Sequence, residues 1–102
     1  MEDMGISRIE INSNNELLVS PKSNINKVFR FVYRADTGIE WSEESQSLYA
    51  LQPQGKSHFD LYKKILSAAS SELGILLKPT NETLWVNVPE ALKVSIDNYV
   101  YQ

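Results

Sequence analysis

The sequence predicts an α+β domain with a mostly antiparallel sheet and two helices packed on one face of that sheet. Short apolar segments suited to strands fill the first half of the chain, and two amphipathic stretches with helical spacing lie in the second half. The strands are grouped ahead of a helix rather than alternating with helices, which is typical of this class. We expect one domain over residues 1–102, with five to seven strands in the order ββ-βββ-α-ββ-α.

A hairpin is expected at the start of the chain, with strands at residues 6–11 and 16–20. The connection Asn12-Ser13-Asn14-Asn15 consists of residues that tolerate left-handed backbone and favour turns. Pro21 should end the second strand, because proline cannot donate a hydrogen bond to a neighbouring strand.

A three-stranded meander is expected next, beginning with residues 28–34. Alternation in that segment places Phe29, Phe31 and Tyr33 on one face, which is typical of a strand. A turn ending at Gly38 leads to a strand at residues 39–41, and a polar turn at residues 42–46 leads to the third strand at residues 47–52. Pairing of the first two strands would bring Arg30 and Arg34 close to Glu40.

The clearest helix is expected from Ser57 or His58 to Leu73. Ser57 and Asp60 approximate a capping box, and Gly74 is a natural residue for the position after a helix. Two short strands follow, at residues 75–78 and 83–86, around a turn at residues 79–81. Asn87 is then expected to cap a second helix, whose apolar stripe consists of Leu92, Ile96 and Tyr99.

Composition excludes several classes of function. The chain has no cysteine, which removes disulfides, thiolate nucleophiles and zinc-thiolate sites, and His58 is its single histidine. We therefore expect no catalytic residues, no metal ligands, no cofactor and no enzymatic activity. The net charge of −3 argues against nucleic acid as a partner. With no apolar segment long enough for a signal peptide or a membrane span, we expect a cytoplasmic protein without a membrane partner.

The steepest charge pattern lies in residues 22–55. Its first part has four cations and no anion, and its second part has four anions and no cation: Lys22, Lys27, Arg30 and Arg34, then Asp36, Glu40, Glu43 and Glu44. Cross-strand pairing with Arg30 and Arg34 could neutralise Glu40. Otherwise the acidic part could bind a basic protein partner, beside two aromatic side chains suited to an interface. The candidate protein-binding residues are Glu40, Trp41, Glu43, Glu44 and Tyr49.

Two alternatives stay open. A small-molecule-binding protein or an enzyme would use a pocket between helix and sheet, with His58, Tyr62 or Trp85 at its mouth. A structural homo-oligomer subunit would use an exposed sheet edge or the tyrosine-rich end of the chain, where Tyr99 and Tyr101 are the candidate interface residues. The same tyrosines could instead dock the last helix onto the sheet.

Three segments have a recognisable pattern: Phe-Val-Tyr-Arg-Ala-Asp-Thr-Gly-Ile-Glu-Trp at residues 31–41, Glu-Leu-Gly at residues 72–74, and Thr-Leu-Trp-Val-Asn-Val-Pro at residues 83–89. Together they resemble a pattern in small bacterial proteins encoded by mobile integron gene cassettes and in toxin-immunity-like proteins. The resemblance covers about two thirds of the chain. It implies a compact accessory protein that acts by binding, with an oligomer as a further possibility, and it supplies no catalytic residue.

Overall fold

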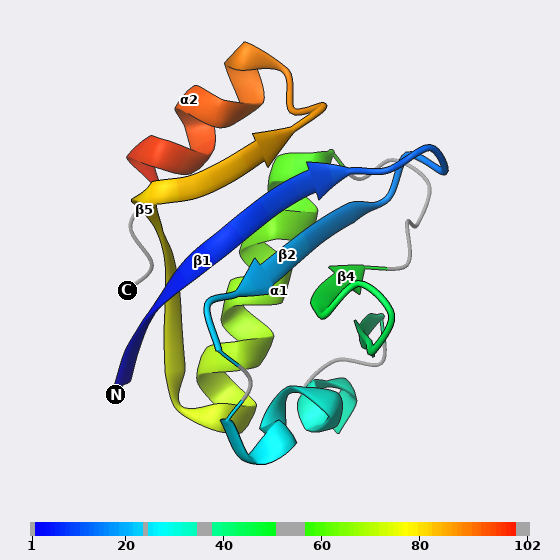
Figure 1. The fold of residues 1–102 in the computed structure, drawn as a ribbon, viewed down its shortest axis with the longest axis vertical. Coiled ribbons are helices and arrows are strands. Elements are labelled where there is room, and N and C mark those ends of the chain that lie inside the picture. The colour runs from blue at the N-terminus through cyan, green and yellow to red at the C-terminus, as the bar shows by residue number, and fades with distance from the viewer. Residues whose placement is uncertain (1, 24, 35–37, 51–56, 100–102) are drawn as a thin grey trace.

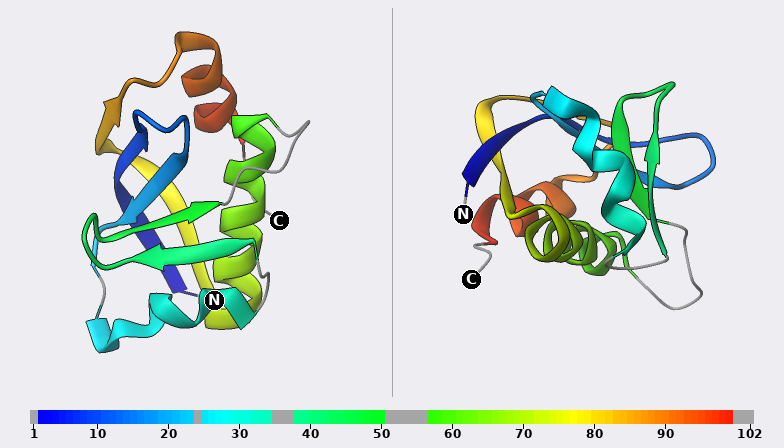
Figure 2. Two further views of the ribbon diagram at one scale, coloured as in Figure 1. Left: turned by 90° about the vertical axis from the view of Figure 1, so that its right-hand side faces the viewer. Right: turned by 90° about the horizontal axis from the view of Figure 1, so that it is seen from below.

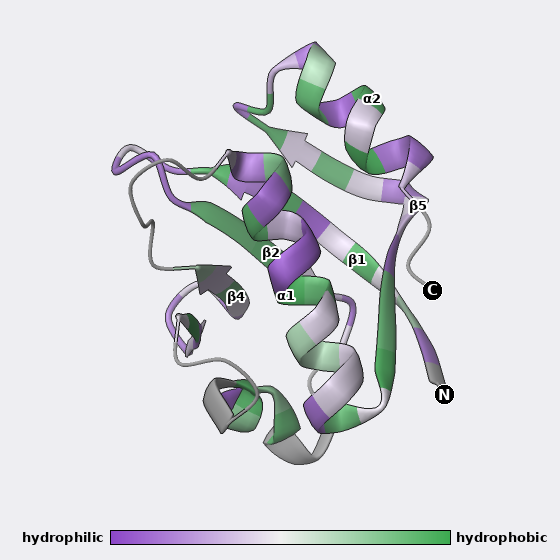
Figure 3. Cartoon of the chain, turned by 180° about the vertical axis from the view of Figure 1, so that it is seen from behind, coloured by the Kyte–Doolittle hydropathy of each residue, from purple (hydrophilic) through white to green (hydrophobic). Residues whose placement is uncertain are grey.

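In the part of the chain that the structure describes, five strands form one sheet in the order β3-β4-β2-β1-β5, and two α-helices cover one of its faces (Figure 1). The computed structural model describes residues 2–23, 25–34, 38–50 and 57–99. The elements are β1 (Glu2–Ile11), β2 (Leu17–Pro21), the 3-10 helix η1 (Ile25–Arg34), β3 (Ile39–Ser42), β4 (Ser47–Ala50), α1 (His58–Leu73), β5 (Ile75–Val86) and α2 (Glu90–Asn98). Figure 3, a view from behind, shows α1 and α2 in front of the sheet.

The sheet is mostly antiparallel, as the sequence predicts. The pairs β1–β2, β2–β4 and β3–β4 run antiparallel, whereas β1 and β5 run parallel. The parallel pair is possible because α1 lies between β4 and β5 in the sequence and returns the chain to the far side of the sheet. The α+β class is confirmed, and the strand count falls at the lower end of the predicted range.

The first hairpin is confirmed. Ile11 pairs with Leu17, and the Asn12 side-chain oxygen accepts hydrogen bonds from the backbone N–H groups of Asn14 and Glu16 at 3.0 and 2.9 Å. Asn15 takes a left-handed conformation with φ of 64°. The side chain of Asn12 and the backbone conformation of Asn15 therefore stabilise the turn. As predicted, β2 ends at Pro21.

The prediction of a strand at residues 28–34 is wrong, because residues 25–34 form η1. A 3-10 helix has three residues per turn, so residues three apart share a face. Phe29 and Val32 fill that face and are both fully buried. Figure 2 shows η1 beside α1 and the β3–β4 hairpin, against which it packs. The expected three-stranded meander is thus reduced to β3 and β4, with Ala50 as the last described residue of β4.

The two strands expected at residues 75–78 and 83–86 are joined in one strand, β5, and the turn predicted between them is wrong. β5 lies at the edge of the sheet, where proline is tolerated, and Pro79 pairs with Ile6. The register then shifts, so that the next pair joins Arg8 to Leu84. The Thr83 hydroxyl bridges this irregularity by donating to the Ile6 carbonyl and accepting from the Thr80 N–H.

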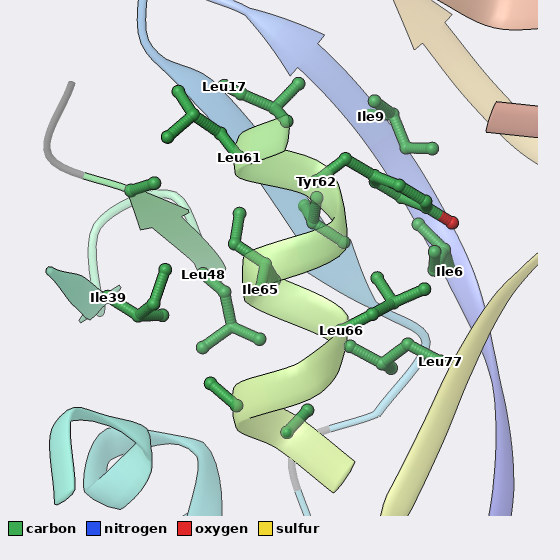
Figure 4. Close-up of a cluster of buried hydrophobic side chains, with 14 of the residues drawn as sticks. Ile6, Ile9, Leu17, Ile39, Leu48, Leu61, Tyr62, Ile65, Leu66 and Leu77 are labelled. Carbon is green, nitrogen blue, oxygen red and sulfur yellow. The ribbon is translucent and has the colours of Figure 1, made fainter. Parts of the chain in front are cut away.

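Helix α1 has the predicted bounds and caps. The Ser57 hydroxyl accepts from the Asp60 N–H at 3.1 Å. A hydrogen bond between the side chains of Ser57 and Asp60 is the largest influence that lowers the pKa of the Asp60 carboxyl. Gly74 follows the helix with φ of 66°. The buried face of α1 carries Leu61, Tyr62, Ile65 and Leu66, which pack against β1, β2, β4 and β5 (Figure 4).

Helix α2 begins later than expected. Its N-cap is Pro89, with no side-chain cap hydrogen bond, whereas Asn87 sits in a left-handed turn with φ of 56°. The prediction of Asn87 as N-cap is therefore wrong. Ile96 is the fully buried residue of α2 and joins the core. Among the described residues, no helix has the length and apolar character needed to cross a membrane.

Candidate functional site

The face of the sheet opposite the helices carries an open hollow, which we call the acidic trough. Figure 1 looks onto this face. Leu18 lies at its floor, 8% exposed, and points away from the core because its neighbours Leu17 and Val19 point into it. The hollow has a volume of about 650 Å³. It is lined by Arg8, Asn12, Asn14, Glu16, Leu18, Ser42, Glu44, Ser45 and Tyr49.

Two turns form the rims of the trough. One is the β1–β2 turn, where the Asn12 amide donates to the Glu16 carboxylate at 2.9 Å. The other is the β3–β4 turn at residues 43–46, where the Gln46 amide donates to the Glu43 carbonyl at 2.8 Å. Local side-chain contacts thus hold both rims in shape.

Arg8 connects the second rim to the centre of the sheet. Its Nη2 donates to the Ser45 carbonyl at 3.3 Å, and its Nε lies 3.5 Å from a carboxylate oxygen of Glu10. Arg8 lines the trough, but its charge faces that of Glu10. Glu10 thus opposes part of the charge that Arg8 brings to the trough.

The trough is strongly acidic. Five glutamates line or border it, against Arg8 as the lining cation: Glu10, Glu16, Glu40, Glu43 and Glu44. The Tyr49 hydroxyl donates to Glu40 at 2.9 Å, and this bond is the main cause of a raised Tyr49 pKa. Burial and the negative charges of Glu40 and Glu16 raise the same pKa further. The raised pKa of Tyr49 thus reflects the negative charge of the neighbouring glutamates.

Four of the five predicted protein-binding residues lie in or beside the trough. Glu44 and Tyr49 line it, Glu40 bonds to Tyr49, and Glu43 stands in the same turn. Trp41 does not belong to this surface. It lies on the core side of β3, stacked on Phe29 with ring centroids 5.6 Å apart.

The predicted strand that would pair Arg30 and Arg34 with Glu40 is absent from the described residues, because residues 25–34 form η1. The Arg30 guanidinium lies over the ring of Phe31, 4.8 Å from its centroid. The Arg34 side chain lies outside the part of the chain that the structure describes. Glu40 instead finds its hydrogen-bond donor in Tyr49, on the neighbouring strand β4.

Arg8, Glu16 and Leu18 belong to the trough, although the sequence did not identify them as site residues. Alternation in the first hairpin could have placed Arg8 and Leu18 on the face away from Ile9 and Val19. The approach of the β3–β4 turn to this hairpin depends on the pairing of β2 with β4, which no local pattern indicates.

A second, smaller hollow lies between α1, β5 and α2. Its volume is about 250 Å³, and Tyr62 lines it, together with Leu66, Leu76, Leu77, Lys78, Pro79, Asp97 and Tyr99. The pocket that the sequence placed between helix and sheet thus contains Tyr62 but neither of the other two predicted residues. His58 Nε2 lies 3.0 Å from the Asn15 carbonyl, and the Trp85 ring lies 5.5 Å from Lys93 Nζ.

Of the two candidate oligomer residues, Tyr99 packs within its own chain. Its ring meets Phe59 and Tyr62 edge-on, at centroid distances of 5.7 and 6.1 Å. Tyr101 lies outside the described residues. Within those residues, no group of three acidic or histidine side chains could hold a metal ion.

Comparison with known proteins identifies the family. The family model described as Integron Cassette Protein Hfx_Cass5 matches residues 4–83. Among solved structures, the chain is 30% identical to the integron cassette protein Hfx_Cass5 from the mobile metagenome of the North West Arm sewage outfall, over 95% of this chain and 94% of that chain, with a TM-score of 0.47. No curated protein matches.

The chain is therefore an integron cassette protein and belongs to the Hfx_Cass5 family. This confirms the resemblance to integron cassette products that the sequence indicated. The description of the family names no activity and no ligand.

Proposed function

We propose that this chain is a non-enzymatic binding protein that neutralises or modulates a protein partner by docking a basic segment of that partner in the acidic trough. The convergence of Glu16 and Glu44 on one hollow carries the proposal. These residues come from two turns far apart in the sequence, and Tyr49 stands beside them. A lysine or arginine side chain entering the hollow would meet carboxylates on both rims.

The electrostatics favour a cationic partner. Bordering glutamates outnumber the lining arginine, and Arg8 already faces Glu10 at 3.5 Å. A concave surface lined by one sign of charge raises the rate at which oppositely charged partners arrive. Such complementarity also disfavours acidic partners, because like charges across an interface repel each other.

The shape favours a protein segment over a small compound. Beyond the Arg8–Ser45 contact, the outer face continues into a third, shallow hollow of about 300 Å³. Ser45 lines both this hollow and the trough, and Leu84 lines this hollow alone. Leu84 is 64% exposed and is the most exposed large apolar side chain among the described residues. An extended segment could therefore place a basic residue in the trough and an apolar one against Leu84.

The trough residues support binding rather than catalysis. Ser42 and Ser45 line the trough, but the chain's one histidine is held at the Asn15 carbonyl. The described contacts of these two hydroxyls are with the Ser45 N–H and with the Ser47 hydroxyl, and neither group is a base that would activate a nucleophile. The polar groups of the trough are better suited to contacting a partner.

The test uses a fluorescent Lys-Tyr-Lys-Tyr-Lys peptide and its Glu-Tyr-Glu-Tyr-Glu counterpart, with binding followed by anisotropy at low and high salt. The double variant Glu16→Gln and Glu44→Gln keeps the oxygen that accepts from Asn12. We expect the wild type to bind the basic peptide, and the variant to associate about tenfold more slowly at low ionic strength. Salt should weaken wild-type binding, because screening shortens the reach of exposed charges.

The matched control is Glu82→Gln with Glu90→Gln, which removes the same amount of charge from β5 and α2. Both side chains are exposed, and neither lines the trough. If the control slows association as much as the trough variant, only net charge matters and the proposed site is wrong. If the wild-type protein binds the basic and the acidic peptide equally well, the proposal of a basic partner is wrong.

A further inference from the structure

The smaller hollow between α1, β5 and α2 holds a polar group without a partner. Tyr62 is fully buried, and its hydroxyl has no hydrogen-bond partner among the described residues. Figure 4 shows the ring projecting from α1 past Ile6 and Ile9 of β1, with the hydroxyl oxygen at its far end. Buried hydroxyls are nearly always hydrogen-bonded, so an unpartnered one on a residue that lines a hollow calls for an explanation.

The Tyr62 ring lies beside Tyr99, another residue that lines this hollow, with ring centroids 6.1 Å apart. Burial is the main cause of a raised Tyr62 pKa, and the neighbouring Tyr99 and Asp97 raise the pKa further. The phenol therefore keeps its proton at neutral pH and can donate a hydrogen bond. Asp97 and Tyr99, from the end of the chain, close the hollow opposite β5.

The other walls define what could fill the space. Leu66, Leu77 and Pro79 give apolar surface on two sides. The two charged residues of the lining oppose each other in sign, and Lys78 already bonds to Asp3 at 3.1 Å. The lining therefore does not favour a cationic or an anionic ligand. A volume of about 250 Å³ lies just below the usual range for drug-sized ligands.

We propose that this hollow is a binding site for a small neutral molecule with an apolar body and one hydrogen-bond acceptor, such as a ketone, with the Tyr62 hydroxyl donating to the acceptor. The site lies on the helical side of the sheet, and it shares no lining residue with the acidic trough. It is therefore independent of partner docking. Affinity comes from the apolar walls, and Tyr62 selects for the acceptor.

The test compares acetophenone with α-methylstyrene, which has the same shape but a methylene group in place of the carbonyl oxygen. Amide and methyl resonances of the wild-type protein are followed during titration with each compound. We expect changes confined to the residues lining the hollow, and about fivefold tighter binding of acetophenone, the value of one net hydrogen bond.

Tyr62→Phe removes the hydroxyl and keeps the ring. Because that hydroxyl has no partner, the variant should fold with at least wild-type stability, which thermal unfolding would verify. We expect it to bind both compounds equally, at the wild-type affinity for α-methylstyrene. The proposal is overturned if the wild type does not distinguish the compounds, if Tyr62→Phe retains the preference, or if neither compound perturbs the resonances of the residues lining the hollow.

Discussion

The hydroxyl of Tyr49 on β4 donates a 2.9 Å hydrogen bond to the carboxylate of Glu40, directly opposite it on β3. The two residues form a cross-strand pair on the solvent face of the sheet, while Trp41 and Leu48 beside them form a pair on the core face. The bond fixes the tyrosine at the wall of the acidic trough. A side chain that the sequence proposed for partner binding is therefore oriented before any partner arrives.

Replacing Glu40 with glutamine should lower the pKa of Tyr49 toward its ordinary value of 10.0, because the bond to Glu40 is the main cause of the upward shift. The native state holds this proton to higher pH than the unfolded chain does. The resulting stabilisation is complete at neutral pH and is lost as the pH rises above about 10. Carbon-13 NMR titration of labelled tyrosine would measure the pKa directly.

Since the chain has five tyrosines, the Tyr49 signal should be assigned through its loss in Tyr49→Phe. Glu43→Gln provides the matched control. It removes a carboxylate from the adjacent turn, but Glu43 is not among the causes of the Tyr49 shift. Equal titration of Tyr49 in the wild type and in Glu40→Gln would mean that the hydrogen bond is absent in solution.

The 3-10 helix η1 can be tested with two phenylalanines. Phe29 is fully buried against Trp41, whereas Phe31 is partly exposed beside Arg30. Phe29→Ala should lower the free energy of unfolding by about 3–5 kcal/mol, and Phe31→Ala by clearly less. Urea denaturation would measure both. In a strand the two side chains would share a face, so equal losses would argue for a strand at residues 28–34.

The same segment shows why sequence patterning failed there. Phe29, Phe31 and Tyr33 alternate as in a strand, but Phe29 and Val32 are also three residues apart, as in a 3-10 helix. The choice depends on what is available to pack against, namely α1 and β3. Long 3-10 helices are uncommon, so local propensity gave no reason to expect one.

Features set by local chemistry were predicted correctly. The asparagine turn of the first hairpin, the Ser57 cap and Gly74 each depend on residues within a few positions of one another. Of the acidic trough, only the part that one local turn supplies could be predicted from the sequence. Glu43 and Glu44 are conspicuous in a turn, but Glu16 reaches the same site only through the pairing of β2 with β4.

Thr83→Val should destabilise the protein through the irregular part of β5. The Thr83 hydroxyl donates to the buried carbonyl of Ile6 and accepts from the Thr80 N–H at 2.8 Å, so valine leaves both groups without this partner. We expect a loss of about 1–3 kcal/mol in urea denaturation. Thr80→Val is the matched control, since the Thr80 hydroxyl makes an exposed 3.2 Å contact with the Glu82 N–H. A control as damaging as Thr83→Val would contradict this account.

Gly74 ends α1 in a left-handed conformation with φ of 66°, and its N–H bonds to the Ser70 carbonyl at 3.0 Å. A Cβ added there meets no atom within 4 Å, so any cost comes from backbone conformation and not from crowding. Gly74→Ala should lower stability by about 1 kcal/mol, or about 4–8 °C in melting temperature. Gly74→Asn should cost less, because asparagine tolerates this region. Calorimetry of both variants tests the ranking, and an alanine variant as stable as the wild type would place the end of the helix elsewhere.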